Sequence, residues 1–298
     1  MPESPQDADQ IYNEGTAEGY GGFVECDANV YGWAKRVLDR NMLEKRTVLD
    51  AGCGKGAMFK HFEAVGATRI IGVEASAQMV NGIPASDHQA IVKWPASKDY
   101  VQRVLALSRH LIIQGPLQEV LQEAGIQAAV AASIFNVVCF SHPREPIESM
   151  AHGVLPGGRL VMVTNAFVPS GLSLDAQCPN AAVDIDLHDP VLHRETLAPG
   201  TVFQQVLHLQ NDDGLPFDLP LQDHAHPIDS FIPPLSDAWE LETVQLFPPQ
   251  GCTLVDPQAP GKYEGAHRHF GNHHPVFSPL ANKRMQYAKL CLVARRRE

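Results

Sequence analysis

The chain has 298 residues, a length that suits one large domain or a domain with a sizeable insertion. Hydrophobic residues make up 44% of it and charged residues 19%, so a packed core is expected and global disorder is not. The formal net charge of −11 argues against nonspecific binding to nucleic acid or to an anionic membrane, because phosphate contacts need clustered Lys and Arg.

The start of the chain and its cysteines indicate a compartment. The first ten residues are polar and acidic, and no apolar run of about 18 residues occurs, so neither a signal peptide nor a transmembrane helix is expected. The six cysteines are scattered without a C-x-x-C pair, which favours free thiols over disulfides or a zinc ribbon. We therefore expect a cytoplasmic protein.

Residues 1–28 are rich in glycine and carry two aromatic side chains, Tyr12 and Tyr20, without the signals of a helix. Two interpretations stay open, a lid segment that folds over a site and a frayed N-terminus. A helix is expected over Asn29–Asn41, where apolar residues recur near helical spacing.

The most informative stretch is Thr47–Gly56, T-V-L-D-A-G-C-G-K-G. A short apolar strand ends at Asp50, and glycines follow at alternate positions, which lets the backbone turn tightly and lets a ligand lie against bare peptide. A second apolar run ends in another acid, Glu74, which can accept hydrogen bonds from the ribose hydroxyls of a nucleoside. The pattern predicts half of a nucleotide-binding βαβ unit.

Strand and helix patterns alternate up to residue 164, which predicts a mostly parallel sheet with helices on both faces. The expected strands after the first lie at Arg69–Ala75, His110–Gln114, Ile126–Val138 and Arg159–Thr164, while residues 84–98 look less regular. Beyond residue 164 the rhythm fails. Further strands are expected at Thr201–Leu209, Glu242–Phe247 and Gln286–Ala294, with Leu215–Leu221 returning as a hairpin.

These motifs resemble those of the class I S-adenosylmethionine (SAM)-dependent methyltransferases. The spacing of the glycines, with an acid before them, differs from the G-x-G-x-x-G fingerprint of NAD or FAD domains, which is the alternative. The family's first motif matches Val48–Gly56, its second-strand acid matches Glu74, and its L-x-P-G-G-x-L motif matches Leu155–Leu160. The loop after the third strand matches only loosely, because Gly115-Pro116-Leu117 lacks the acid often found there.

The resemblance implies a doubly wound, seven-strand, mostly parallel Rossmann-like α/β sheet whose last strand is antiparallel. It divides the chain into a lid (1–28), a SAM-binding core (29–164), a cap insertion (165–235) and a C-terminal completion of the sheet (236–298). The cofactor is SAM, and the residues expected to bind it are Tyr12, Tyr20, Asp50, Ala51, Gly52, Cys53, Gly54, Gly56, Glu74, Ala75, Met79, Gly115, Pro116, Leu117, Ser133, Phe135 and Asn136. For Cys53, packing as a small buried side chain is favoured over a nucleophile.

The activity that the resemblance implies is methyl transfer to a small-molecule nucleophile. Two alternatives stay open: another SAM-consuming reaction on the same fold, and a noncatalytic SAM-binding protein. His142 and His226 are the candidate bases, and Tyr20 is a candidate for steadying the sulfonium. We expect no nucleic-acid or membrane partner, and a homodimer stays open.

Two histidine-rich segments have competing interpretations. Asp223–Pro227 sits where small-molecule members of the family carry a D-x-H-x-P-like segment, so its histidines either contact substrate or have a structural role. His267, His269, His273 and His274 could line a substrate pocket, bind a metal or lie in a solvated loop. No cysteine or carboxylate stands nearby at metal-ligand spacing, so no metal is predicted.

Overall fold

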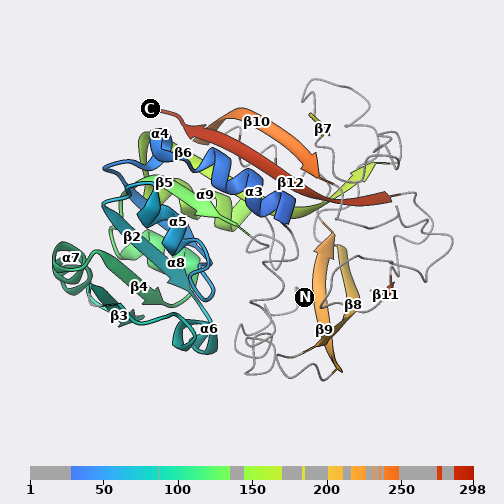
Figure 1. Ribbon diagram of the computed structural model, residues 1–298, viewed down its shortest axis with the longest axis horizontal. Helices are drawn as coiled ribbons and strands as arrows, with labels where there is room; N and C mark the ends of the chain where they lie inside the picture. Colours follow the sequence, from blue (N-terminus) through green and yellow to red (C-terminus); the bar gives the residue numbers. More distant parts are fainter. Residues whose placement is uncertain are drawn as a thin grey trace.

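The fold comes from a computed structural model of the full chain (Figure 1). The structure describes residues 28–86, 88–134, 144–169, 183–184, 201–210, 216–225, 231, 235, 238–247, 274–276 and 285–298.

The main element is a nine-stranded sheet with the order β3-β4-β2-β1-β5-β6-β12-β10-β7. The first six strands in this order pair in parallel, and β12, β10 and β7 are antiparallel to their neighbours. The strands are β1 (Thr47–Ala51), β2 (Arg69–Glu74), β3 (Gln89–Lys93), β4 (His110–Gln114), β5 (Ala128–Ser133), β6 (Val154–Pro169), β7 (Val183–Asp184), β10 (Trp239–Phe247) and β12 (Met285–Arg296).

The expected doubly wound fold is confirmed, and so is the antiparallel last strand, but the strand count of seven was wrong. The two additional strands are β3, in the stretch that looked irregular, and the two-residue β7. Both are at the edges of the sheet. Strand β6 also continues through Pro169, five residues beyond the expected end, and pairs with β12 from Arg159 to Pro169.

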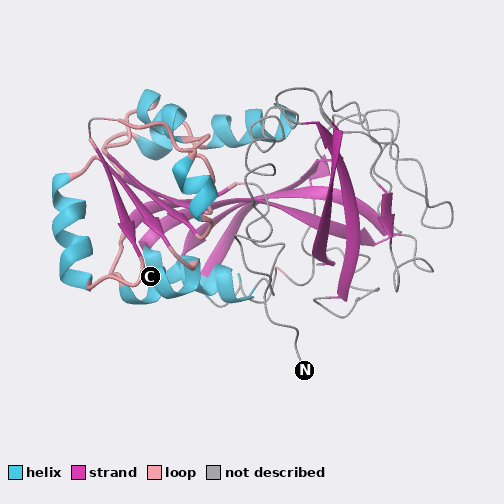
Figure 2. Ribbon diagram, turned by 90° about the horizontal axis from the view of Figure 1, so that it is seen from below, coloured by secondary structure: helices cyan, strands magenta, loops and turns pink. Residues whose placement is uncertain are grey.

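Helices cover both faces of the sheet (Figure 2). They are α3 (Ala28–Val37), α4 (Arg40–Leu43), α5 (Phe59–Ala64), α6 (Ala77–Asn81), α7 (Lys98–Leu107), α8 (Leu117–Glu123) and α9 (Arg144–Gly153). Short polar side chains begin several of them: the side chains of Ser76 and Ser97 accept hydrogen bonds from the Met79 and Tyr100 amides.

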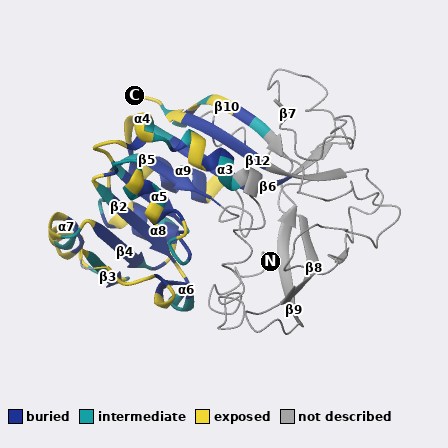
Figure 3. Cartoon of the chain, viewed as in Figure 1, coloured by how far each residue is buried: buried dark blue, intermediate teal, exposed yellow. Residues whose placement is uncertain are grey.

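The sheet separates two hydrophobic cores. Successive residues of β1 point to opposite faces, so Val48 packs with α3 and α5, while Leu49 packs with α7, α8 and α9. Because both faces are covered, the central strands are apolar at nearly every position, which is the pattern that made them recognisable in the sequence. Figure 3 shows these strands buried and the outer surfaces of the helices exposed.

Two consecutive glycines form the bulge that begins β6, and they are needed for different reasons. Gly157 has a φ of +74° with open space around it, whereas a Cβ on Gly158 would lie 2.6 Å from the Ala129 carbonyl oxygen and 2.8 Å from that of Leu155. Backbone atoms cannot swing aside as a flexible side chain can. We therefore expect Gly158→Ala to lower the free energy of unfolding by roughly 2–4 kcal/mol, and Gly157→Ala by only about 1 kcal/mol.

Urea denaturation of the two variants measures this difference. The two variants carry the same substitution at adjacent positions. If both lose the same free energy of unfolding, contact with the backbone around Gly158 is not the reason that a side chain is excluded there.

A separate three-stranded sheet has the order β11-β8-β9. The expected hairpin is present as β8 (Thr201–Gln210) and β9 (Pro216–Ala225), and His224 lies on β9. Strand β11 (His274–Val276) pairs with β8, so the backbone of His274 belongs to a strand; His267, His269 and His273 lie outside the described residues.

Candidate functional site

The carboxyl ends of four parallel strands meet at one edge of the sheet. Because β4, β2, β1 and β5 are consecutive neighbours, this edge brings together Asp50 of β1, Glu74 of β2, Gly115 after β4 and Ser133 of β5. In open α/β sheets, ligands bind at this edge.

The glycine turn after β1 is fastened to the neighbouring strand. Gly52, Gly54 and Gly56 all have positive φ, at +71°, +53° and +74°, which explains why glycines alternate there. The Gly52 and Cys53 amides both donate to the Val73 carbonyl oxygen, at 2.8 and 3.1 Å. The turn therefore has a fixed position beside the end of β2.

Glu74 links that turn to the start of α6. Its Oε2 accepts from the Gly54 amide and its Oε1 from the Ser76 amide, both at 2.9 Å, and the side chain is buried. These two bonds fix the orientation of the carboxylate at the strand edge.

The Asp50 carboxyl is buried next to a second acid, which disfavours its ionised form. It is only 3% exposed, and burial, followed by the negative charge of Glu74, raises its pKa to about 7. A cation bound beside it would favour the ionised form and lower that pKa. The pair of acids thus forms a site that gains from a positively charged ligand group.

Cys53 does not have the properties of a nucleophile. Burial, followed by the charges of Asp50 and Glu74, raises the pKa of the thiol well above its usual range, so it is neutral. A Cβ on Gly72 would lie 2.7 Å from the Cys53 sulfur, which shows how closely the thiol packs on β2. This agrees with its interpretation as a small packed side chain.

The other described residues of the expected cofactor set lie on the same edge or next to it. Met79 on α6 and Leu117 at the start of α8 are buried, and Gly115 donates its amide to the Glu74 carbonyl oxygen at 2.9 Å. The Ser133 hydroxyl is buried with no hydrogen-bond partner among the described residues. Ala51 ends β1, and Ala75 and Pro116 are exposed beside Glu74 and Gly115.

Six residues of the expected site lie outside the described residues: Tyr12, Tyr20, Phe135, Asn136, His142 and His226.

Tyr31 on α3 is a residue of this site that the sequence analysis missed. Its hydroxyl donates to the Ala57 carbonyl oxygen at 2.7 Å. Burial and then the charge of Asp50 raise its pKa, so the phenol lies within electrostatic reach of that acid. The sequence analysis used only the spacing of the apolar residues of this helix. The signal that could have identified Tyr31 is its spacing of four residues from Lys35, which places both side chains on one face of the helix.

The described part of the chain contains no cluster of three or more His, Cys, Asp or Glu side chains arranged to hold a metal ion. Within the same residues no helix has both the length and the apolarity to cross a membrane.

Comparison with known proteins assigns the core. The family model described as a methyltransferase domain matches residues 29–166. No curated protein matches the chain in sequence. The putative methyltransferase in complex with the Trm112 methyltransferase activator of Haloferax volcanii is similar in fold, with a TM-score of 0.51, 12% identity and coverage of 97% of this chain and 98% of that chain. The sugar N-methyltransferase KedS8 of Streptoalloteichus sp. aligns with a TM-score of 0.48 and 16% identity over 94% of this chain and 90% of its own.

The residues at the strand edge fit S-adenosylmethionine. The compound carries a cationic ammonium, which suits the buried Asp50 carboxyl, and a ribose diol, which suits the oriented carboxylate of Glu74. The unpartnered Ser133 hydroxyl offers a further polar contact at the same edge. Residues 29–166, which match the model of a methyltransferase domain, contain this strand edge with Asp50 and Glu74.

Proposed function

We propose that the enzyme transfers the methyl group of SAM to an oxygen, nitrogen, sulfur or carbon nucleophile of a small molecule by in-line displacement. The observation that carries this proposal is the pair of buried acids, Asp50 and Glu74, held at adjacent strand ends on either side of a fixed glycine turn.

Each part of the strand edge has a task in this proposal. Glu74 accepts the ribose hydroxyls, because its carboxylate is already oriented by the Gly54 and Ser76 amides. Asp50 receives the ammonium directly or through water, and the backbone of Gly52–Gly54 lies along the methionine arm. Leu117 and the backbone of Gly115 and Pro116 face the adenine.

When bound, SAM supplies an already activated methyl group and leaves as S-adenosylhomocysteine. The protein then contributes mainly proximity and orientation. A base is needed only for an acceptor that arrives protonated, and His142 and His226 are the candidates for that task, with Tyr20 as a ring that steadies the sulfonium.

The net charge of −11 and the scarcity of basic clusters favour a small-molecule acceptor over nucleic acid. We propose that residues 165–235 form a cap that selects it and that residues 1–28 form a lid.

Product analysis tests the reaction. The purified chain is incubated with SAM and a panel of amine, hydroxyl, thiol and carboxylate acceptors, and the nucleoside products are separated by chromatography. Acceptor-dependent formation of S-adenosylhomocysteine is the expected result. Methylthioadenosine as the product would overturn methyl transfer in favour of another SAM-consuming reaction, and tight SAM binding without turnover over the whole panel would favour a noncatalytic binding protein.

A further inference from the structure

A groove of about 640 Å³ runs from the glycine turn along α5. Its lining includes Asp50 and Gly52, residues of α3 and α5, Ile83–Ser86 and Gln89. His110, at the start of β4, also lines it. This residue lies two positions before the one that pairs, through Gly72 of β2, with Asp50. The groove therefore begins at the proposed cofactor site and leads away from it.

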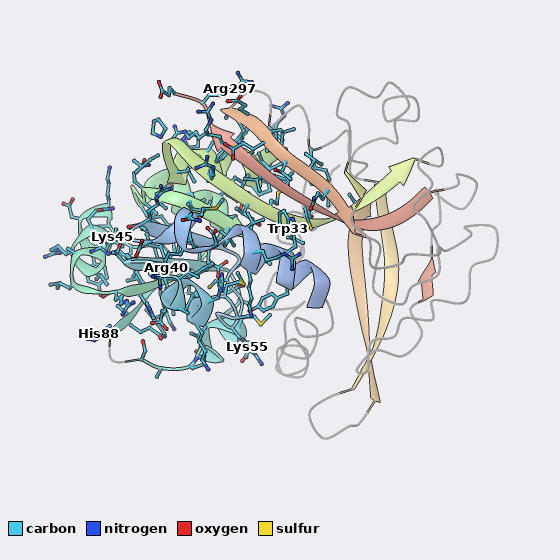
Figure 4. The ribbon with its side chains drawn as sticks, turned by 45° about the horizontal axis from the view of Figure 1, so that its top comes forward. Trp33, Arg40, Lys45, Lys55, His88 and Arg297 are labelled. Carbon is cyan, nitrogen blue, oxygen red and sulfur yellow. The ribbon has the colours of Figure 1, made fainter. Side chains whose placement is uncertain are left out.

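Three lysines from three different elements line this groove: Lys35 of α3, Lys55 of the glycine turn and Lys60 of α5. Over the part of the chain that the structure describes, none of them has a carboxylate within ion-pair distance. The Lys35 ammonium lies 4.1 Å from the centre of the Tyr31 ring, and the carbon chain of Lys55 packs on Gly82. Figure 4 shows the position of Lys55.

The two carboxyl groups in the groove offset only part of this positive charge, because they face three lysines. Asp50 titrates near neutral pH, and the Glu63 carboxylate lies 2.9 Å from the His110 ring. In a chain with a net charge of −11, three lysines around one opening, without an ion-pair partner among the described residues, form a local site for an anion.

One part of the groove lining is apolar, and the part around His110 is polar. Met58, Phe59 and Ile83 are buried and line the groove. His110 approaches the Ser86 hydroxyl through Nδ1, at 3.5 Å, and burial lowers its pKa, so the ring is neutral. A ligand that matches all three zones has an anionic group, an apolar body and a hydrogen-bonding tip.

We propose that this groove binds an amphipathic organic anion and that this anion is the methyl acceptor. The assignment as acceptor rests on the proposed function, because Asp50 and Gly52 line the groove and are also the expected contacts of the methionine arm. A molecule in the groove therefore lies beside that arm of the cofactor.

Two fluorescent probes that share an apolar body test the charge requirement. Anilinonaphthalene sulfonate carries an anionic group and N-phenylnaphthylamine does not. The test variant replaces Lys35, Lys55 and Lys60 by glutamine. Because the variant loses three attractive charges, it is expected to bind the sulfonate about tenfold or more weakly and the neutral probe within about twofold of the wild type.

A matched control replaces Lys45, Lys93 and Lys98 by glutamine, which changes the net charge equally at exposed positions outside the groove. It should bind both probes as the wild type does. A second variant, Ala85→Trp, places a large side chain in the groove and should weaken both probes.

Calorimetry with S-adenosylhomocysteine separates this proposal from the proposed function. The expected result is that the wild type and the control variant bind S-adenosylhomocysteine equally well and that the wild type binds the sulfonate with the cofactor product present. Sulfonate binding that is absent, unaffected by the groove lysines, or displaced by S-adenosylhomocysteine would overturn the groove as an acceptor site, even if cofactor binding is intact. Loss of S-adenosylhomocysteine binding in the wild type would instead overturn the proposed function.

Discussion

Asp50→Asn is expected to stabilise the ligand-free protein at pH 8 while weakening its affinity for SAM and S-adenosylhomocysteine. The Asp50 pKa is about 7 in the folded chain against an ordinary value of 3.8, so the ionised form is destabilised by burial and by Glu74. At about 1.4 kcal/mol per pKa unit, removing that charge should raise the free energy of unfolding by on the order of 4 kcal/mol. We expect a gain of roughly 2–4 kcal/mol, because a buried amide keeps part of the desolvation cost.

The pH dependence has a definite sign. Because the folded pKa is raised, Asp50 contributes stability that is fully present below about pH 4 and is lost as the pH rises through 7. Urea denaturation should therefore show little difference between D50N and the wild type near pH 4, and a gain in the variant that grows up to about pH 7 and then levels off. A gain of the same size at pH 4 and pH 8 would mean that the charge of Asp50 is not its cause.

Cofactor affinity should change in the opposite direction. If Asp50 accepts the ammonium, the wild type should bind S-adenosylhomocysteine more tightly as Asp50 ionises. Calorimetry should therefore show that the ratio of wild-type to D50N affinity rises with pH up to about 7. At pH 8 the variant should bind about tenfold to a hundredfold more weakly, as expected for a lost charge-assisted hydrogen bond. Asp99→Asn, at an exposed position on α7, is the control and should leave both stability and affinity unchanged.

The parts of the fold that the sequence predicted are those in which local and tertiary preferences agree. Val48 and Leu49 are both buried because helices cover both faces of the sheet, so an uninterrupted apolar run marks β1 correctly. The alternate glycines have positive φ, a requirement that few other residues meet. The acids at 50 and 74 were placed together because the ends of adjacent parallel strands must meet at one edge.

The features that the sequence did not predict depend on contacts between distant segments. Strand β3 is an edge strand with only Val92 fully buried, so its alternation is too weak to distinguish it from a loop. The groove lysines at 35, 55 and 60 come from three elements, and nothing in their spacing shows that they face one opening. Tyr31 reaches Ala57 across 26 residues, a contact that only the packing of α3 on the glycine turn creates.

Glu74→Ala is expected to weaken S-adenosylhomocysteine binding by more than the loss of a ribose contact alone. The ribose hydroxyls should account for about 1–3 kcal/mol. The structure adds a second effect, because the same carboxylate accepts the Gly54 and Ser76 amides, and without it the glycine turn loses its link to α6. We therefore expect an affinity loss of about a hundredfold or more and a fall in the free energy of unfolding of about 1–3 kcal/mol from the two unpaired amides.

A cycle that combines the variant with a modified ligand separates the two effects. S-adenosylhomocysteine and its 2′-deoxy analogue are titrated into the wild type and into Glu74→Ala, with Glu123→Ala on the exposed surface of α8 as the control. If Glu74 holds the ribose, removing the hydroxyl should weaken binding to the wild type and to the control but hardly to the variant, because its partner is already gone. An equal loss of affinity in all three proteins would leave Glu74 as an anchor of the glycine turn and would mean that the ribose assignment is wrong.

The two amide bonds already fix the Glu74 carboxylate in the ligand-free chain, so the wild type should bind without reorienting this side chain. No binding energy is then spent on ordering it, and the full contribution of the ribose hydroxyls should appear in the measured affinity.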